Sequence, residues 1–342
     1  MDPGIAARKK MIRRPALVGT AWRTAALTAS IKTETKLNIM KKWVAAGCLV
    51  LASAGAAAAT WTLTGDIVSH DPHLYKAANT WWIVETSDTG VGVKYSANGR
   101  AWTQGVPIFG NGLPWWGQYN GNKKQAWAPD LHEWNGKAIL YYAVSTFGSQ
   151  KSAIGLATAS SIAQGNWVDQ GAILTSAPGD NFNAIDPNFF VDKAGQPWLS
   201  YGSFQTGIYI TRVDANTLKP FGAKTRLATD SIGIENPFIV ANGSYYYLFV
   251  SKGKCCDGAN STYRIAYGRS TSVTGPYLDK NGVDMRNGGG TVLDAGGGRF
   301  IAPGAESISN GVLARHALDT QNNYTPVLFM SDLFFTNGWP TY

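Results

Sequence analysis

The sequence predicts an all-β protein built as a five-bladed β-propeller with its active site at the mouth of the central channel. Short runs rich in Val, Ile, Tyr and Trp alternate with clusters of Gly, Asn, Asp and Pro, and no long segment has a helical period. A unit of about 50 residues, the size of a four-stranded propeller blade, also recurs along the chain. Five such units fit into residues 60–342.

Nine runs have the composition of strands, and they divide among the repeated units. Each unit begins with an acid beside a proline, and an apolar run, a Gly-centred turn and a Tyr-, Trp- or Leu-rich run follow. The first four units are predicted to start at Asp71, Asp130, Asp186 and Glu235, and a weaker fifth starts in the segment 302–305. The nine predicted strands span 80–87, 137–145, 152–160, 197–203, 207–213, 244–251, 262–270, 311–318 and 325–332.

The beginning of the chain resembles an export signal rather than part of the fold. Residues 40–59 contain two lysines, then a short apolar run and an Ala-rich end, which predicts a secretory signal peptide cut near Ala59. Lipoprotein processing at Cys48 is the alternative. Residues 1–39 are interpreted as an over-long gene start or a non-native leader, so the catalytic domain is expected over 60–342.

The net positive charge of the chain, +8, lies in this leading part. Of the 30 basic and 22 acidic residues, ten basic and two acidic residues lie within 1–59, so residues 60–342 carry 20 of each. A formally neutral domain has no basic excess for phosphate backbones, and we therefore expect no nucleic-acid partner. After cleavage of the signal we also expect no membrane association.

Cysteine usage gives no metal pattern. Cys48 belongs to the predicted signal, whereas Cys255 and Cys256 are adjacent, and no CxxC or His-spaced zinc motif occurs. The adjacent pair can form a vicinal disulfide or remain as thiols. We expect a local loop feature away from the chemistry.

Three acids stand within otherwise apolar runs, in "SHDPHLY", "NAIDPNFF" and "GIENPFIV". Burying an ionised carboxylate costs free energy unless something pairs with it or uses it. The innermost strand of each blade lines the channel, so Asp71, Asp186 and Glu235 from three blades can converge on one axial pocket. The alternative is that they only cap strands or accept bonds from backbone donors.

Motifs over most of the chain resemble those of a known family. They are "HDP" (70–72), "WAPD" (127–130), "SAIGLATAS" (152–160), "IDP" (185–187), "YGSF" (201–204), "IENPFI" (234–239), "CCDGANSTYRI" (255–265) and "DLFFTNGWP" (332–340). In this order, the stretch 65–340 resembles glycoside hydrolase family 43, in particular its endo-1,5-α-L-arabinanases. That resemblance implies a five-bladed propeller, in agreement with the repeat count.

The resemblance also implies an inverting mechanism with three carboxylates. It makes Asp71 the general base that activates water, Glu235 the general acid that protonates the leaving oxygen, and Asp186 the carboxylate that raises the pKa of the acid and orients it. Inversion needs an acid and a base on opposite faces of the scissile bond, roughly 6.5–9.5 Å apart. A nearby like charge or a desolvated site keeps such an acid protonated near neutral pH.

Aromatic and amide side chains are expected to bind the sugar. Trp127 and then Phe147 are the candidates for stacking on an arabinose ring, while Asn183 and Ser203 can bond its hydroxyls. Asp130 is expected to orient the backbone or a sugar. The pair at 115–116, two tryptophans, is either an exposed rim or a buried pair.

His316 resembles a family histidine in the channel near a bound calcium or other cation; a hydrogen-bonded core histidine is the alternative. Calcium itself prefers oxygen ligands. Two positions depart from the family pattern, because Ala305 stands where a histidine is expected and Gln205 where a tryptophan is expected. Both leave subsite affinity, metal occupancy and endo or exo action open. No organic cofactor is expected.

These observations favour a secreted hydrolase of arabinan, the α-1,5-linked side chain of pectin, acting in an endo mode. Other family 43 activities remain open, namely exo-arabinanase, arabinofuranosidase or xylosidase action. A non-catalytic carbohydrate-binding propeller would be expected to lack one of the acids, and a protein-interaction propeller would not need all three. A closed propeller has few free strand edges, so we expect a monomer.

Overall fold

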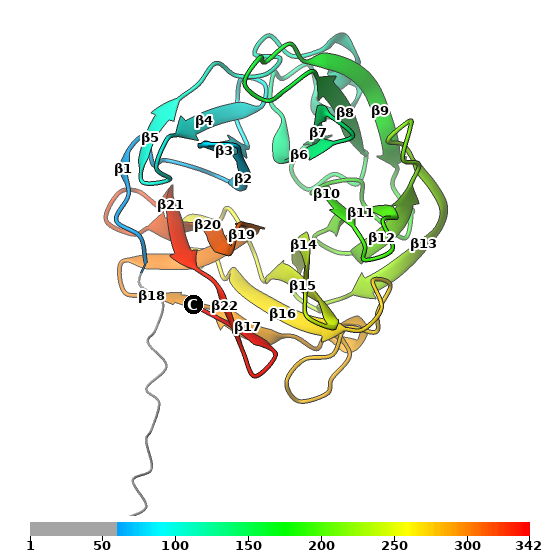
Figure 1. The fold of residues 1–342 in the computed structure, drawn as a ribbon, viewed down its shortest axis with the longest axis vertical. Helices are drawn as coiled ribbons and strands as arrows, with labels where there is room; N and C mark the ends of the chain where they lie inside the picture. Colours follow the sequence, from blue (N-terminus) through cyan, green and yellow to red (C-terminus); the bar gives the residue numbers. More distant parts are fainter. Residues whose placement is uncertain (1–59) are drawn as a thin grey trace, which may run out of the picture. The chain divides into compact units, whose positions relative to one another are not determined.

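The computed structural model describes residues 60–342, which form five blades around a central channel (Figure 1). The predicted propeller is confirmed. The expectations for the leader 1–39, the signal 40–59 and Cys48 lie outside the described residues. Within 60–342 we find no helix with the length and apolar character that a membrane crossing requires.

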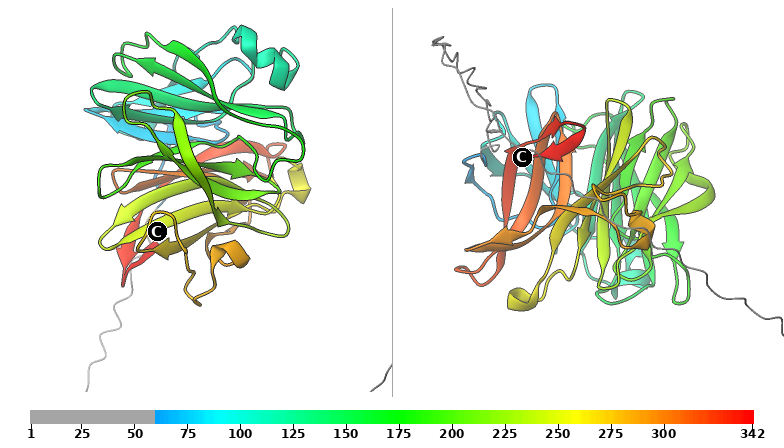
Figure 2. Two further views of the ribbon diagram at one scale, coloured as in Figure 1. Left: turned by 90° about the vertical axis from the view of Figure 1, so that its right-hand side faces the viewer. Right: turned by 90° about the horizontal axis from the view of Figure 1, so that it is seen from below.

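The blades follow one another along the chain, each with its first long strand at the channel, and Figure 2 shows the twisted sheets from the side. Blade one consists of β2 (His73–Ala77), β3 (Thr80–Glu85), β4 (Gly92–Ser96) and β5 (Ala101–Gln104), and β1 (Thr64–Gly65) pairs in parallel with β5. Blade two consists of β6 (Trp127–Trp134), β7 (Lys137–Val144), β8 (Ser152–Ala159) and β9 (Val168–Ser176). Blade three consists of β10 (Asn188–Val191), β11 (Pro197–Ser203), β12 (Gly207–Val213) and β13 (Pro220–Ala228). Blade four consists of β14 (Ile234–Asn242), β15 (Tyr245–Lys252), β16 (Arg264–Ser270) and β17 (Thr291–Asp294). Blade five consists of β18 (Gly296–Gly297), β19 (Phe300–Ser309), β20 (Val312–Asp319) and β21 (Thr325–Asp332).

The remaining elements are short. A C-terminal hairpin packs its aromatic rings beside blade four, with Phe335 and Trp339 against the core around Tyr247. The hairpin consists of β22 (Phe334–Thr336) and β23 (Trp339–Thr341), and the helical turns are η1 (Pro114–Trp116), α1 (Gly117–Asn120), η2 (Gly258–Asn260) and η3 (Met285–Asn287).

Hydrogen bonds between the beginning and the end of the described chain close the ring. Trp61 N donates to Met330 O at 2.8 Å, Ser69 N donates to Pro326 O at 3.1 Å, and Leu328 N donates to Ile67 O at 2.8 Å. Residues 60–69 therefore run along β21 of blade five before the chain enters blade one. This closure leaves β21 paired on both sides.

The five inner strands share one backbone irregularity at their channel-mouth ends. A residue in a left-handed conformation, with φ between 36° and 51°, occurs at Asp71, Ala128, Asp186, Asn236 and Ala305, and blade five has a second one, Ala302. A proline directly follows the first four of these positions, whereas in blade five Pro303 follows Ala302, and the strand register slips there in β6, β14 and β19. A bulge re-aims the side chain at that position, and proline is tolerated because the bulged residue needs no ladder bond.

This bulge corrects the alignment of repeats that the sequence predicted. Asp71 and Asp186 are the bulge residues of blades one and three, but Asp130 lies two residues after the bulge of blade two. Glu235 lies one residue before the bulge of blade four. The acid-beside-proline pattern was therefore not equivalent in the four blades, because the proline marks the bulge and the acid can stand on either side of it.

Polar side chains two residues beyond the bulge join neighbouring blades inside the channel. Asn188 Nδ2 donates to Asp130 Oδ1 at 3.0 Å, while Ile239 N donates to Asn188 Oδ1 at 3.0 Å. Ser307 Oγ accepts from Leu74 N at 2.9 Å. These side chains satisfy backbone groups of the adjacent inner strand, so the channel wall is cross-linked by hydrogen bonds rather than by packing alone.

Candidate active site

A cavity of about 460 Å³ opens at the channel mouth, between the loops of blades two, three and four. Glu235 is the one catalytic candidate in its wall. The four side chains predicted to bind sugar all line it, namely Trp127, Phe147, Asn183 and Ser203. The aromatic and amide candidates and the predicted general acid thus come together in one place.

Glu235 is the second residue of β14, and its carboxyl group is held by a phenol. Tyr263 Oη donates a hydrogen bond to Glu235 Oε2. Burial raises the pKa of Glu235 to about 7, and the negative charge of Asp71 adds to the rise, while the bond from Tyr263 opposes it. A carboxyl group with a pKa near 7 can hold a proton at neutral pH and release it during a reaction.

Asp186 lies at the bulge before β10, below the cavity, with 7% of its surface exposed. Its Oδ2 accepts a hydrogen bond from Asn236 N at 3.2 Å, which ties it to the residue next to Glu235. Burial raises the pKa of Asp186, and the charges of Glu235 and Asp71 raise it further. Because two close carboxylates resist simultaneous ionisation, this pair retains a proton near neutral pH.

Asp71 is the bulge residue of blade one and is surrounded by donors. Thr86 Oγ1 donates to Asp71 Oδ2 at 2.5 Å, and Thr86 in turn accepts from Ala128 N at 2.8 Å. The Asp71 backbone N–H donates to His316 Nδ1 at 3.2 Å. A left-handed backbone conformation is uncommon for residues other than glycine, although Asp tolerates it better than most. Such a conformation persists where contacts with the surrounding structure hold the residue in place.

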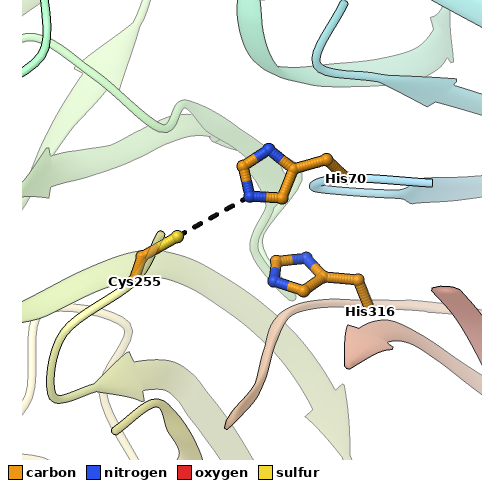
Figure 3. Close-up of side chains that lie close together, drawn as sticks. All are labelled: His70, Cys255 and His316. Carbon is orange, nitrogen blue, oxygen red and sulfur yellow. Dashed lines mark hydrogen bonds between the residues drawn. The ribbon is translucent and has the colours of Figure 1, made fainter. Parts of the chain in front are cut away.

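His316, on β20, lies beside His70, with 4.7 Å between their ring centroids (Figure 3). Burial lowers the pKa of His316 to about 3, and the neighbouring His70 adds to this, so the imidazole is neutral and its Nδ1 is an acceptor. The other metal-ligand type beside it is a sulfur of Cys255. Two imidazoles and a disulfide sulfur do not form a calcium cage, which requires six to eight oxygens. We derive no catalytic step through a cation at His316.

Cys255 and Cys256 form a vicinal disulfide, and both line the cavity. Their Sγ atoms each lie 3.6 Å from His70 Nε2. Our expectation that the pair lies away from the chemistry was therefore wrong. The loop 254–257 follows β15 and folds back over the mouth, which adjacency in the sequence could not reveal.

Comparison with known proteins agrees with this geometry. Residues 64–340 match the family described as Glycosyl hydrolases family 43. The chain belongs to this family. An extracellular endo-α-(1→5)-L-arabinanase of Bacillus subtilis (strain 168) is 45% identical over 90% of this chain and 97% of its own length.

Two further family 43 relatives frame the range of activities. An extracellular exo-α-(1→5)-L-arabinofuranosidase of Cellvibrio japonicus (strain Ueda107) is 34% identical over 90% of this chain and 93% of its own length. The solved structure of an endo-arabinanase from Bacillus licheniformis is 48% identical, covers 82% of this chain and 100% of its own, and superposes with a TM-score of 0.80. This family 43 protein is thus a glycosidase, with both endo- and exo-named relatives.

The cavity of this family 43 enzyme has one unusually exposed aromatic ring. Phe147, on the loop after β7, is 76% exposed although it belongs to the cavity wall. Gln205, where the family resemblance led us to expect tryptophan, also lines the cavity. Ala305, where the family resemblance led us to expect histidine, is 4% exposed and does not line this cavity.

Two other predicted positions are structural. Asp130 is 1% exposed and accepts from Phe189 N at 2.8 Å, which bears out an orienting role toward the backbone and not toward a sugar. Trp116 is buried, while Trp115 is partly buried and bonds Asp169 through its indole N–H at 3.0 Å. The tryptophan pair is core, not rim.

Sequence reasoning missed several residues of the site. Tyr263 and Thr86 contact the carboxyl groups of Glu235 and Asp71, which are predicted to be catalytic, and Phe204 and Lys254 line the cavity. Tyr263 stood within the quoted motif "CCDGANSTYRI", so a signal for it existed. Thr86 had none, because a hydroxyl after a strand is common and its partner lies fifteen residues earlier.

Proposed function

We propose that this protein is a secreted hydrolase that cleaves α-1,5-linked L-arabinan internally, with Asp71, Asp186 and Glu235 as its catalytic carboxyl groups. The observation that carries the proposal is the position of Glu235. Its pKa of about 7 and its place in a cavity wall next to Trp127 suit a general acid beside a bound sugar. The names of the relatives supply the substrate class.

In the proposed reaction, Asp71 accepts a proton from a water molecule as the water oxygen attacks the anomeric carbon. Glu235 donates its proton to the glycosidic oxygen, and the bond between that oxygen and the anomeric carbon breaks. The product has inverted configuration, and Asp71 and Glu235 return to their starting states by exchange with solvent. Asp186 keeps Glu235 protonated by its charge and holds Asn236 beside it.

Substrate binding is assigned to the wall of the cavity. The faces of Trp127 and Phe147 would stack on furanose rings, and Asn183 and Ser203 would bond hydroxyls. An exposed ring at the rim, such as Phe147, suits a polymer that passes across the site rather than a chain end held in a closed pocket. Internal cleavage follows from such binding.

Product analysis tests the proposal. Purified protein is incubated with linear 1,5-α-arabinan, and products are separated over time for wild type, Glu235→Gln and the matched surface variant Glu133→Gln. We expect mixed short oligosaccharides from wild type and E133Q, and a loss of about 10²–10⁴-fold in rate for E235Q. Proton NMR of the first product formed would show the inverted anomer.

Each other outcome has a distinct meaning. Arabinose as the sole early product would replace endo by exo action. Release of xylose from xylan, with arabinan untouched, would change the substrate class. No product from any arabinose or xylose polymer, with retarded migration in an arabinan affinity gel, would replace catalysis by carbohydrate binding.

Secretion and the monomeric state are part of the same proposal. The relative from Bacillus subtilis is named extracellular. We expect secreted protein whose N-terminal residue, determined by sequencing, is Thr60. Light scattering of this product should give the mass of one chain; a dimer mass, or a mature form that begins at Cys48, would contradict it.

A further inference from the structure

The chain has four histidines, and they belong to two clusters of possible metal ligands. His70 and His316 flank Asp71 near the mouth and belong to the site already described. The other two, His73 and His132, lie on the inner strands of blades one and two and take no part in the proposed reaction. Each places a ring nitrogen against the same buried carboxylate, Asp130.

The three side chains present three ligand atoms to one another. His73 Nδ1 is 3.1 Å from Asp130 Oδ1, and His132 Nε2 is 3.0 Å from Asp130 Oδ2. All three ligand atoms lie within 4.8 Å of one another. Tetrahedral zinc ligands at about 2.0–2.1 Å from the metal are themselves roughly 3.3 Å apart, and the two nitrogen–oxygen distances are close to this spacing.

The tautomer of His73 is fixed by its second nitrogen. Nε2 is 3.0 Å from the carbonyl oxygen of Leu131, and a carbonyl can only accept, so Nε2 carries the proton. In neutral His73 the lone pair of Nδ1 therefore faces Asp130. An imidazole whose far N–H is bonded to a backbone carbonyl is the usual arrangement of a metal-ligating histidine.

His132 gives an independent observation. Its Nε2 is shielded from solvent and, despite its short distance to Asp130, makes no hydrogen bond. The carboxylate itself is supported from outside by Asn188 Nδ2 at 3.0 Å and by Phe189 N at 2.8 Å. A buried anion that faces two ring nitrogens, with its outer lone pairs already bonded, is suited to hold a cation together with those nitrogens.

We propose that His73, Asp130 and His132 bind a divalent transition-metal ion, with Zn²⁺ as the best fit, in the channel between blades one and two. Two imidazoles and one carboxylate are ligands for zinc and its neighbours in the first transition row, whereas calcium and magnesium prefer oxygen alone. Water from the channel supplies the fourth ligand. The ion would join β2 to β6 and stabilise the ring, separately from hydrolysis.

The chain is well suited to a direct binding test. Among the described residues, its other histidines are His70 and His316, and its cysteines there are joined in a disulfide, so a tag-free protein offers little competing zinc affinity. His132→Phe removes one ligand in an aromatic environment, beside Tyr75 and Phe189, and breaks no hydrogen bond of His132 Nε2. His70→Phe is the matched control at the mouth, because His70 is 28% exposed and not part of the cluster.

The protein is stripped with chelator and titrated with Zn²⁺ by calorimetry. We expect one ion per chain in wild type and H70F, at least tenfold weaker binding in H132F, and no competition from Ca²⁺. Saturating Zn²⁺ should raise Tm by about 5–10 °C in wild type and leave H132F unchanged. Failure of wild type to bind Zn²⁺, or equal binding by wild type and H132F, would overturn the proposal.

A second measurement keeps the test decisive if H132F does not fold. Co²⁺ added to the stripped wild-type protein should give intense visible bands of tetrahedral nitrogen and oxygen coordination, without sulfur-to-metal charge transfer. X-ray absorption of the Zn²⁺ form should show two imidazoles. Sulfur ligands would place the metal at Cys255 instead, and imidazolium signals of His73 and His132 that persist with Zn²⁺ present would show that a proton fills the cluster.

Discussion

The Thr86 hydroxyl donates to Asp71 Oδ2 at 2.5 Å and accepts from Ala128 N at 2.8 Å. It thus connects a backbone N–H of blade two to the proposed base in blade one. Asp71 is thereby held as an acceptor with a fixed orientation. We expect Thr86→Val to lower kcat by about 10–100-fold through misorientation of the base, with KM nearly unchanged. Steady-state kinetics check this, with the exposed Thr89→Val as control; an equal loss in both variants would argue against the relay.

We expect Tyr263 to set the alkaline limit of activity through Glu235. The bond from its phenol lowers the pKa of Glu235, which burial raises to about 7. A general acid works only while protonated, so kcat/KM should fall as pH rises through about 7. In Tyr263→Phe the lowering contribution is lost, the pKa of Glu235 rises, and the basic limb of the pH profile moves to higher pH. An unchanged basic limb would show that another group controls it.

Replacement of Asp186 should shift the basic limb of the pH profile in the opposite direction. Repulsion between Asp186 and Glu235 is mutual and raises the pKa of whichever group holds the proton. Asp186→Asn keeps an acceptor for Asn236 N but removes the charge, so the basic limb should move to lower pH and kcat should fall by about 10²-fold. If D186N and Y263F shift the pH profile in the same direction, the charge of Asp186 does not raise the pKa of Glu235.

Phe147 offers a test of substrate stacking with little effect on folding, because 76% of its surface is exposed. Phe147→Ala should remove about 1 kcal/mol of binding, which raises KM roughly fivefold at similar kcat. Phe334→Ala, 51% exposed on the C-terminal hairpin, is the control. Kinetics on arabinan oligosaccharides of increasing length would reveal where along the chain the ring acts.

Lys94 is a buried cation whose removal should be costly to stability. Its Nζ lies 2.7 Å from Glu85 and 2.9 Å from Asp66, and its side chain is 2% exposed. Lys94→Ala should lower the free energy of unfolding by about 3–5 kcal/mol by leaving Glu85 unpaired, as urea titration would measure. Burial raises the pKa of Glu85, and the charge of Lys94 opposes this rise. The loss of unfolding free energy in K94A should therefore be greatest at high pH, where Glu85 is ionised. It should be smaller below the pKa that Glu85 has in the unfolded chain, because Glu85 is then protonated in both states. A loss that is independent of pH would exclude this cause.

The sequence predicted the middle of each blade better than its margins. The nine runs coincide with strands such as β7, where all but the first residue is buried, because both faces pack on neighbouring blades and the run is apolar throughout. Outer strands such as β9, whose burial alternates with exposure, carry polar residues and were not predicted. The three acids were found because a carboxylate in an apolar run is unusual, whereas Tyr263 and Thr86 are ordinary residues that acquire a role only through long-range contacts.

The same limit explains the histidines. His132 follows Asp130 by two residues and so lies on the same face of β6, but only the packing of two inner strands brings His73 of β2 to the same carboxylate. The bulge itself is hidden in the sequence, because its left-handed residue is Asp, Asn or Ala in different blades, and in blade five the proline follows Ala302 rather than Ala305. A pattern based on one residue type could not align these positions.

The closure of the ring by residues 60–69 against β21 has a consequence for the order of folding. Blade five is complete only when the first described residues meet the last strand, a contact between segments at opposite ends of the domain. Blades one to four can form their hairpins from local sequence as soon as they are available, whereas blade five must wait for the whole chain. The native ring therefore cannot close while the polypeptide is still emerging from a ribosome or a translocation pore, and its final step is a single long-range docking of the two ends.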